Sequence, residues 1–191
     1  MRRNLEQLVN RIIQEVKISS PPINAESLAE FYFGLDFDCD ILSDDTAAML
    51  SVEERKIYMN ELFADKFAAN EGFKNFTIAH ELGHWVLHQN SSRTRSPKIE
   101  REAELFAVYL LMPETFVRDE FVKLNSSRLL RCLPAETKLE MMASKFCVSL
   151  QAMRIRLSQD ELKLIYVAKD GKCYRSHEEF LEIVGGQMRL F

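Results

Sequence analysis

The first part of the chain has apolar residues at steps of three and four, which is the spacing of one face of a helix. They are Leu5, Leu8, Val9, Ile12, Ile13 and Val16. This pattern predicts an amphipathic helix, which Pro21-Pro22 separates from a second, short helix expected over residues 25–33. Gly34 closes the second helix.

Shorter apolar runs follow, and their length is typical of strands. The expected strands cover residues 37–42, 47–51 and 55–59, and the last two are joined across Val52-Glu53-Glu54. They predict a small sheet ahead of the next helix. An edge strand of such a sheet can pair with an extended peptide through main-chain hydrogen bonds. Residues 55–60 are either that edge or an ordinary interior strand.

Helical spacing returns around residue 80. An apolar side is formed by Ile78, Ala79, Leu82, Trp85 and Val86, and the polar residues of this segment fall opposite it. Ser96-Pro97 is typical of an N-cap followed by proline at the first helical position, and Pro113 marks the far end, so residues 97–112 are expected to be helical. A further helix is expected to pass through Phe116, Phe121 and Leu124.

The last third of the chain has a basic, helical stretch. Residues 127–157 carry six Lys or Arg against two Glu, and their apolar spacing predicts two helices around a turn, with Ser149 as an N-cap. The outline is that of a helix-turn-helix without a glycine at the turn. We expect a packing element or a surface that docks a substrate, and we do not expect DNA contact. Residues 162–168 and 173–174 flank Asp170-Gly171 and predict a β-hairpin.

Composition adds limits to this outline. The 191 residues are 47% apolar with a net charge of −4, which suits a globular protein and argues against general affinity for nucleic acid. The four cysteines are far apart and form no CxxC pair, which is typical of a reduced cytoplasmic protein. No apolar run has the length of a membrane span, and no secretory signal is apparent.

The motif with chemical content is His80-Glu81-Leu82-Gly83-His84. Residues i and i+4 share one face of a helix, so both imidazoles can reach one Zn²⁺ with bonds of about 2.0–2.1 Å. Glu81 can accept a proton from water that such an ion has made more acidic. The alternative is a core helix with inert, hydrogen-bonded histidines. His88 repeats the spacing but lies about 12 Å along the axis from His80, so we expect it at the rim of the site.

A catalytic zinc site needs a third protein ligand. The first turn of the helix over residues 97–112 supplies candidates. Glu100 shares a face with Glu104, Ala103 and Ala107, and the small alanines on that face allow a close approach to the histidine helix. We take Glu100 as the third ligand and Glu104 as an acceptor that orients a ligating imidazole, with Glu102 as the fallback. For each glutamate taken by itself, the alternative is that the carboxylate only stabilises the N-terminus of the helix and binds no metal.

These residues resemble the ImmA/IrrE-type metallopeptidases. The matching strings are residues 76–84 with Leu87-His88, then residues 100–107 running into Leu110-Leu111-Met112-Pro113, and weaker similarity extends over residues 23–157. The resemblance implies that His80 and His84 bind metal, that Glu81 is the base, and that a glutamate of the second string, Glu100, is the third ligand. It also implies that the substrates are DNA-binding repressors. Glu104 stands where the family more often has Asn or Asp.

The fold class that we predict is α+β. A mostly helical zincin-like domain over residues 1–125, with a small three-stranded sheet ahead of the HExxH helix, precedes a helix-turn-helix-like and β-hairpin region over residues 126–191, which is a candidate substrate-docking appendage. The expected function is that of a cytoplasmic, zinc-dependent endopeptidase that cleaves a specific protein, a transcriptional repressor, with Mn²⁺ as an alternative ion.

Two other functions remain open. In one, the metal is structural and the protein binds a repressor without cutting it. In the other, residues 127–157 bind operator DNA. For the peptidase, an oxyanion-stabilising group is also expected, and Tyr58, Tyr109 and His177 are the available candidates.

Overall fold

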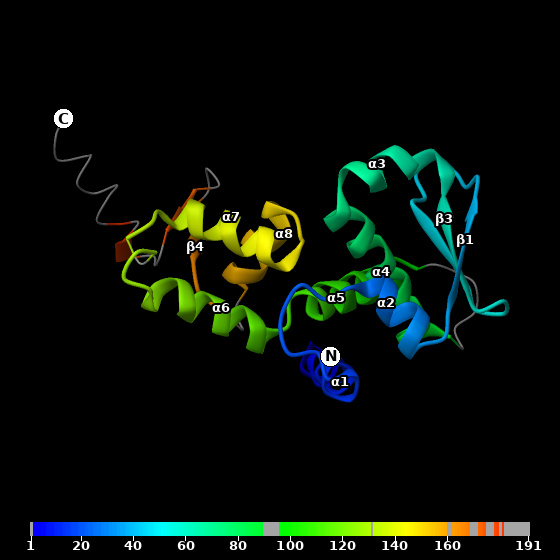
Figure 1. The fold of residues 1–191 in the computed structure, drawn as a ribbon, viewed down its shortest axis with the longest axis horizontal. Coiled ribbons are helices and arrows are strands. Elements are labelled where there is room, and N and C mark those ends of the chain that lie inside the picture. Colours follow the sequence, from blue (N-terminus) through cyan, green and yellow to red (C-terminus); the bar gives the residue numbers. More distant parts are fainter. Residues whose placement is uncertain are drawn as a thin grey trace. The chain divides into compact units, whose positions relative to one another are not determined.

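The computed structural model describes residues 2–89, 96–130, 132–159, 162–168, 172–174, 178, 179 and 181. Within these ranges the chain is mainly helical, with a three-stranded sheet and a two-stranded sheet (Figure 1). The predicted α+β class is confirmed. Every helix in the described part of the chain is too short or too polar to cross a bilayer.

Contacts divide the chain into two compact units. The first is Met1–Pro113 with Phe146–Val148, and the second is Glu114–Lys145 with Ser149–Phe191. The domain boundary predicted from the sequence lies after residue 125, at the end of helix α6 (Glu114–Ser126). In the structure α6 belongs to the second unit, where its residues Phe121 and Asn125 line a cavity together with Leu139 and Leu157.

The first unit begins with helix α1 (Arg2–Val16), whose buried face is formed by Leu5, Val9, Ile12 and Ile13. This face packs on α5 (Pro97–Leu111). The second predicted helix consists of α2 (Ala25–Ser27) and a π-helical turn, η1 (Leu28–Tyr32). Gly34 follows with φ +63°, a left-handed conformation that glycine adopts without strain.

The three expected strands are present as β1 (Asp36–Asp40), β2 (Ala48–Ser51) and β3 (Lys56–Asn60). Their order is β1-β3-β2, with β1 parallel and β2 antiparallel to β3. Residues 55–60 therefore form the interior strand and not the edge, which decides the alternative left open by the sequence. The interior position suits β3, since Ile57, Met59 and Asn60 are buried.

Asn60 holds the loop between β1 and β2. Its buried amide donates to the carbonyls of Ser43 at 3.0 Å and Thr46 at 2.7 Å. Its oxygen accepts from the backbone N–H of Leu42 at 3.3 Å and of Leu62 at 3.1 Å, the latter at the start of the 3-10 turn η2 (Glu61–Phe63). Burying an amide is costly unless it is hydrogen-bonded, and this one has partners on both sides. The loop that leads into β2 is therefore fixed from the central strand.

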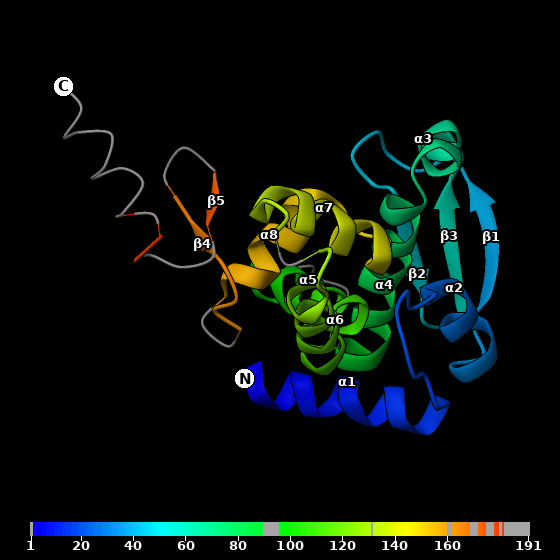
Figure 2. The ribbon, with the colours of Figure 1, turned by 60° about the vertical axis from the view of Figure 1, so that its left-hand side comes forward.

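Helices α3 (Ala64–Ala69) and α4 (Glu71–His88) follow the sheet. Figure 2 shows α4 between β2 and α5, and α4 contacts both elements. The predicted helix over residues 97–112 is confirmed as α5, with the Ser96 hydroxyl accepting from the N–H of Ile99 at 3.4 Å and Pro97 in the first turn.

The second unit contains α6, α7 (Ala135–Phe146), α8 (Leu150–Ser158) and the hairpin strands β4 (Tyr166–Val167) and β5 (Cys173–Tyr174). Ser149 caps α8 as predicted, accepting from the N–H of Ala152 at 3.1 Å. The turn ahead of α8, which lacks a glycine as noted from the sequence, has Cys147 in the left-handed conformation, with φ +52°. Residues 170–171 of the predicted hairpin lie outside the described residues.

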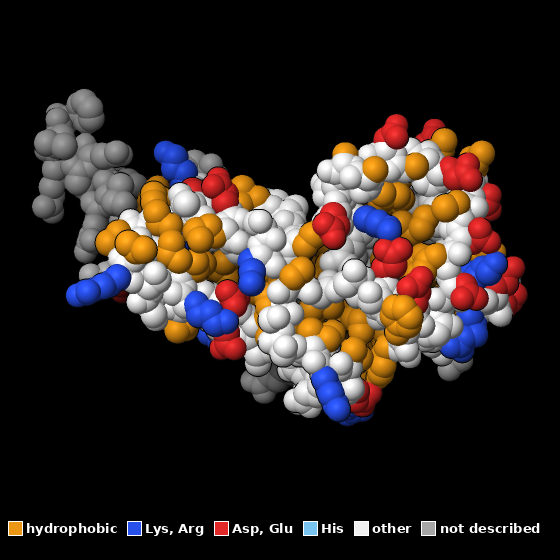
Figure 3. All heavy atoms as spheres, viewed as in Figure 1, with side chains coloured by type: hydrophobic (Ala, Val, Ile, Leu, Met, Phe, Trp, Pro, Cys, Tyr) orange, Lys and Arg blue, Asp and Glu red, His pale blue; other side chains and the backbone are white. Residues whose placement is uncertain are grey.

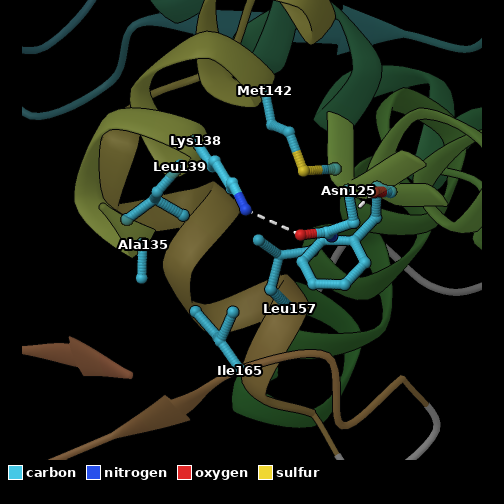
Figure 4. Close-up of a pocket in the computed structure, with 8 residues that line it drawn as sticks. Asn125, Ala135, Lys138, Leu139, Met142, Leu157 and Ile165 are labelled. Carbon is cyan, nitrogen blue, oxygen red and sulfur yellow. Dashed lines mark hydrogen bonds between the residues drawn. The ribbon is translucent and has the colours of Figure 1, made fainter. Parts of the chain in front are cut away.

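A small apolar cavity in this unit is lined in part by the buried ammonium of Lys138 (Figure 4). Lys138 Nζ donates to Asn125 Oδ1 at 2.7 Å, and Asn125 Nδ2 donates to the carbonyl of Phe121 at 2.8 Å. This amide therefore links α7 to α6. Around it the unit's core contains Leu139, Met142, Met153, Leu157 and Ile165.

Candidate metal centre

Helix α4 holds the first part of the site. Asn70 caps it, its side chain accepting from the N–H of Phe73 at 2.9 Å. The apolar side predicted from the sequence is buried, with Ile78, Ala79 and Leu82 at most 1% exposed. On the polar side Glu81 and His84 are buried as well, whereas the His80 side chain is 22% exposed. Packing of its apolar residues therefore fixes the position of the helix, and His80 faces the opening of the site.

The second part is the first turn of α5, which carries Glu100. What brings it near α4 is a backbone contact between the two helices. Gly83 has so little room that an added Cβ would lie 2.8 Å from both Cα and the carbonyl oxygen of Ala103. Ala103 itself is fully buried. The close approach expected from the small residues of α5 is therefore present, and it depends equally on the glycine of the HELGH motif.

At this crossing three side chains converge. His80 Nε2 lies 3.2 Å from Glu100 Oε2, His84 Nε2 lies 3.6 Å from the same oxygen, and the two imidazole nitrogens are 3.1 Å apart. A tetrahedral zinc with bonds of about 2.0–2.1 Å holds its ligand atoms about 3.3 Å from one another. The donor set and its spacing fit such an ion, and within the described ranges the cluster consists of these three residues.

Glu81 contacts the sheet. Its Oε2 accepts a hydrogen bond from the backbone N–H of Leu50 in β2 at 3.0 Å. The carboxylate is 3% exposed, so the N–H replaces part of the hydration that it lost on burial. This bond joins residues 31 positions apart, and no local pattern in the sequence announces it.

The remaining acidic candidates of α5 lie elsewhere. Glu104 is exposed, and among the described residues the imidazoles of the cluster have Glu100 and not Glu104 as their carboxylate neighbour. Glu102 Oε2 lies 3.4 Å from His88 Nε2, and both side chains are largely buried. His88 is thus engaged beside the cluster and outside it, as its distance along the helix predicted.

The candidates for oxyanion stabilisation differ in position. Tyr58 lies between the buried residues Ile57 and Met59, so its side chain points to the opposite face of the sheet. There its hydroxyl donates to Glu54 at 3.0 Å, a hydrogen bond that raises the pKa of the phenol. Tyr109 is buried within α5. His177 lies outside the described residues.

Residues 45–158 match the family described as the IrrE N-terminal-like domain, Peptidase M78. The chain belongs to this family. The matched segment includes β2, all of the HELGH motif and Glu100, whereas the weak similarity noted over residues 23–44 falls outside it. Membership of the M78 family supports a metallopeptidase-type function. The cluster of His80, His84 and Glu100 is a group that can bind a metal ion.

A solved structure with a similar fold is a Mycobacterium tuberculosis transcriptional regulator. The two chains are 16% identical, with a TM-score of 0.57, over 91% of this chain and 55% of that chain. At this identity the likeness shows a shared fold alone, and the M78 chain spans about half the length of the regulator. No curated protein matches the chain significantly.

The basic stretch of the second unit is largely engaged within that unit. Arg156 is fully buried and Lys138 is 5% exposed. Arg154 Nη2 lies 3.2 Å from Glu136 Oε2. Of the six basic residues, Arg128 and Lys145 are the exposed ones among those that the structure describes. DNA binding needs clustered, exposed positive charge, so this distribution does not favour the DNA-binding alternative.

Proposed function

We propose that the protein is a metal-dependent endopeptidase that cleaves one specific intracellular protein. The observation that carries this proposal is the triangle of donor atoms on His80, His84 and Glu100, with sides of 3.1–3.6 Å, beside a buried glutamate. A peptidase of this kind needs three ligands, a base and an opening toward solvent. The side chains of His80 and Glu100 are 22% and 36% exposed, which supports access to the centre.

In this proposal His80, His84 and Glu100 hold a divalent ion. Zn²⁺ suits a set of two nitrogens and one oxygen, and Mn²⁺ is an alternative because such ligands accept several divalent ions. When bound, the ion supplies Lewis-acid polarisation of the scissile carbonyl and makes water more acidic.

Glu81 is the proposed general base. A carboxylate can remove a proton from the attacking water and then deliver it to the nitrogen that leaves the cleaved bond. Its burial keeps bulk water from competing for that proton, and its bond to the N–H of Leu50 limits the directions in which the carboxylate can turn. In this proposal Glu81 transfers the proton, whereas Glu100 binds the metal ion.

The substrate segment is proposed to lie along β2. Within the described residues, β1 and β2 are the edge strands of the sheet, and their compositions differ. The outer strand β1 carries Asp36, Asp38 and Asp40, all exposed, and acidic side chains gather over this end of the first unit (Figure 3). Charged edges repel incoming strands. Strand β2 is the uncharged sequence Ala-Met-Leu-Ser and contacts α4, so it is the edge suited to strand addition beside the centre.

The proposed substrate is a DNA-binding transcriptional repressor. The resemblance to ImmA/IrrE-type enzymes implies such substrates, and a chain of similar fold is itself a transcriptional regulator. The second unit is the proposed docking surface. A cytoplasmic location, inferred from the scattered cysteines, is part of this proposal. A narrow substrate range follows from the need to protect other cytoplasmic proteins, and digestion of unrelated unfolded chains by the purified protein would contradict it.

The substitution Glu81→Gln tests this function. The amide keeps the size and the acceptor oxygen of the carboxylate but cannot carry the proton. We expect bound metal to be retained and cleavage to be lost. In cells that express either form, the measurement is the set of new protein N-termini by mass spectrometry, with one in a DNA-binding protein expected for the unmodified protein only. If the variant relieves repression as well as the unmodified protein does, the regulatory module that sequesters a repressor is the correct function.

A further inference from the structure

The hydrogen bond between Glu81 and Leu50 involves the free edge of β2. Strand β2 pairs with β3 so that Met49 faces Tyr58 and Ala47 accepts a bond from the N–H of Asn60 at 3.0 Å. In an antiparallel ladder alternate residues direct both N–H and C=O toward the partner strand. Ala47, Met49 and Ser51 therefore bond to β3. The main-chain groups of Ala48 and Leu50 point away from it, toward the edge that faces the site.

The edge N–H of Leu50 is thus occupied by a side chain of the reaction centre. An edge strand presents unpaired N–H and C=O groups that another strand can use. Here the carboxylate of Glu81 takes the N–H of Leu50 at 3.0 Å, while the outward carbonyls of Ala48 and Leu50 and the N–H of Ala48 have the orientation that a substrate strand needs. The N–H of Leu50 therefore bonds to the base, and the neighbouring main-chain groups of the edge can bond to the substrate.

We propose that the main-chain N–H of Leu50 is a positioning group for Glu81 and that it thereby sets which peptide bond of a substrate on β2 meets the base. This inference rests on the proposed peptidase function. A base acts efficiently only when its oxygen is held near the proton that it removes, and a misplacement of about 1 Å can cost about a hundredfold in rate. The donor that holds Glu81 belongs to the same strand that pairs with the substrate, so both are aligned by one rigid element.

This arrangement has a consequence for the register of cleavage. A substrate strand that uses the outward groups of Ala48 and Leu50 can slide only in steps of two residues, because the pairing groups repeat with that period. Glu81 bonds to this edge at the N–H of Leu50. The bond that is cut is therefore the peptide that lies beside Leu50.

The first test needs no substrate. In nuclear magnetic resonance of the protein in D₂O, the amide of Leu50 should exchange more slowly than an outward amide without such an acceptor. Glu81→Ala should speed the exchange of Leu50 about tenfold or more, which is the scale of a lost bond to a charged group. Glu81→Gln, which keeps an acceptor oxygen, should leave Leu50 protected and shows whether the helix is intact. Equal exchange of Leu50 in all three proteins would overturn the proposal.

The second test removes the N–H without changing a side chain. Leucic acid in place of Leu50 converts the amide to an ester, and lactic acid in place of Ala48 is the matched change at the other outward position. The probe is a peptide that spans the site found from the new N-termini in cells. At Leu50 we expect kcat to fall about 10–100-fold with KM little changed. At Ala48 we expect KM to rise with kcat little changed, because that group is proposed to bind substrate.

The outcomes separate the two proposals. Cleavage that proceeds equally with and without the Leu50 N–H would overturn the positioning role and leave the peptidase intact. Absence of cleavage by the unmodified protein, with Leu50 still protected from exchange, would overturn the peptidase and with it the catalytic meaning of the bond. A shift of the cut site in the Leu50 ester would support the control of register directly.

Discussion

Replacing Gly83 with alanine should separate the two helices that carry the candidate ligands. The added Cβ would lie 2.8 Å from Cα and the carbonyl oxygen of Ala103, whereas ordinary contacts begin at 3.4 Å. Both obstructing atoms are backbone, so no side chain can turn aside. Restoring ordinary contact therefore requires the helices to move apart by about 0.6 Å, the difference between these two distances. Glu100 moves with α5 and the histidines move with α4.

The expected magnitudes differ for stability and for metal binding. Overpacking of this kind costs about 1–3 kcal/mol. Alanine is also the better helix former by about 1 kcal/mol, so the free energy of unfolding without metal should fall by only about 0–2 kcal/mol. Ligand distances in a metal site tolerate only about 0.2 Å. The displacement exceeds this tolerance, and we expect zinc affinity to fall by about tenfold or more.

The assay is a competition titration of Zn²⁺ against a chromophoric chelator, with thermal unfolding of the metal-free protein measured in parallel. Gly72→Ala is the matched control, because it is the same change in the same helix. Its Cβ would lie 2.8 Å from the carbonyl oxygen of Cys147. It should lower stability and leave zinc affinity unchanged, since Gly72 lies about 12 Å along the axis from His80. Unchanged zinc affinity in Gly83→Ala would refute the role of the close helix contact.

Two further predictions concern the second unit and the thiols. Asn125→Ala removes the acceptor that lies 2.7 Å from the buried Lys138 ammonium. Loss of an acceptor of this kind should lower the free energy of unfolding by about 1–3 kcal/mol. Urea unfolding measures this decrease, and an unchanged unfolding midpoint would contradict the prediction. Burial raises the pKa of the Cys147 and Cys173 thiols. Alkylation at neutral pH, followed by peptide mapping, should therefore label the exposed Cys39 and Cys132 before Cys147 and Cys173. Equal labelling of all four cysteines would contradict this prediction.

Local sequence patterns predicted much of the fold, because helices and strands depend strongly on interactions between residues that are close in sequence. The spacing of apolar residues and the caps at Ser96 and Ser149 depend on neighbours within a few positions, and they gave helices that end close to the observed bounds. The strands were found for the same reason. Their order was not predictable, because β1 and β3 pair in parallel across a long connection and nothing local selects the interior strand.

The candidate site shows the same division. The spacing of the histidines and the glutamates of the next helix could be recognised in the sequence. The angular positions of the glutamates around α5 favoured Glu100 over Glu102 as the third ligand. The orienting role expected for Glu104 finds no support in its exposed position. The contact of Gly83 with Ala103 and the bond from Leu50 to Glu81 join elements that only the folded chain brings together. The basic residues of 127–157 were expected to belong to a packing element or a docking surface and not to contact DNA. Which of them are buried, as Lys138 and Arg156 are, is a tertiary property that the sequence does not show.

Zinc stoichiometry in three forms of the protein tests the central claim most directly. Glu100→Ala removes the proposed third ligand, and Glu104→Ala makes the same change one turn further along, at an exposed side chain. We expect one equivalent of zinc in the unmodified protein and in Glu104→Ala. In Glu100→Ala the affinity should fall by more than the roughly 10–100-fold typical of a residue that only supports a ligand. One tightly held equivalent in Glu100→Ala, or its loss in Glu104→Ala, would contradict the metal centre proposed for this protein.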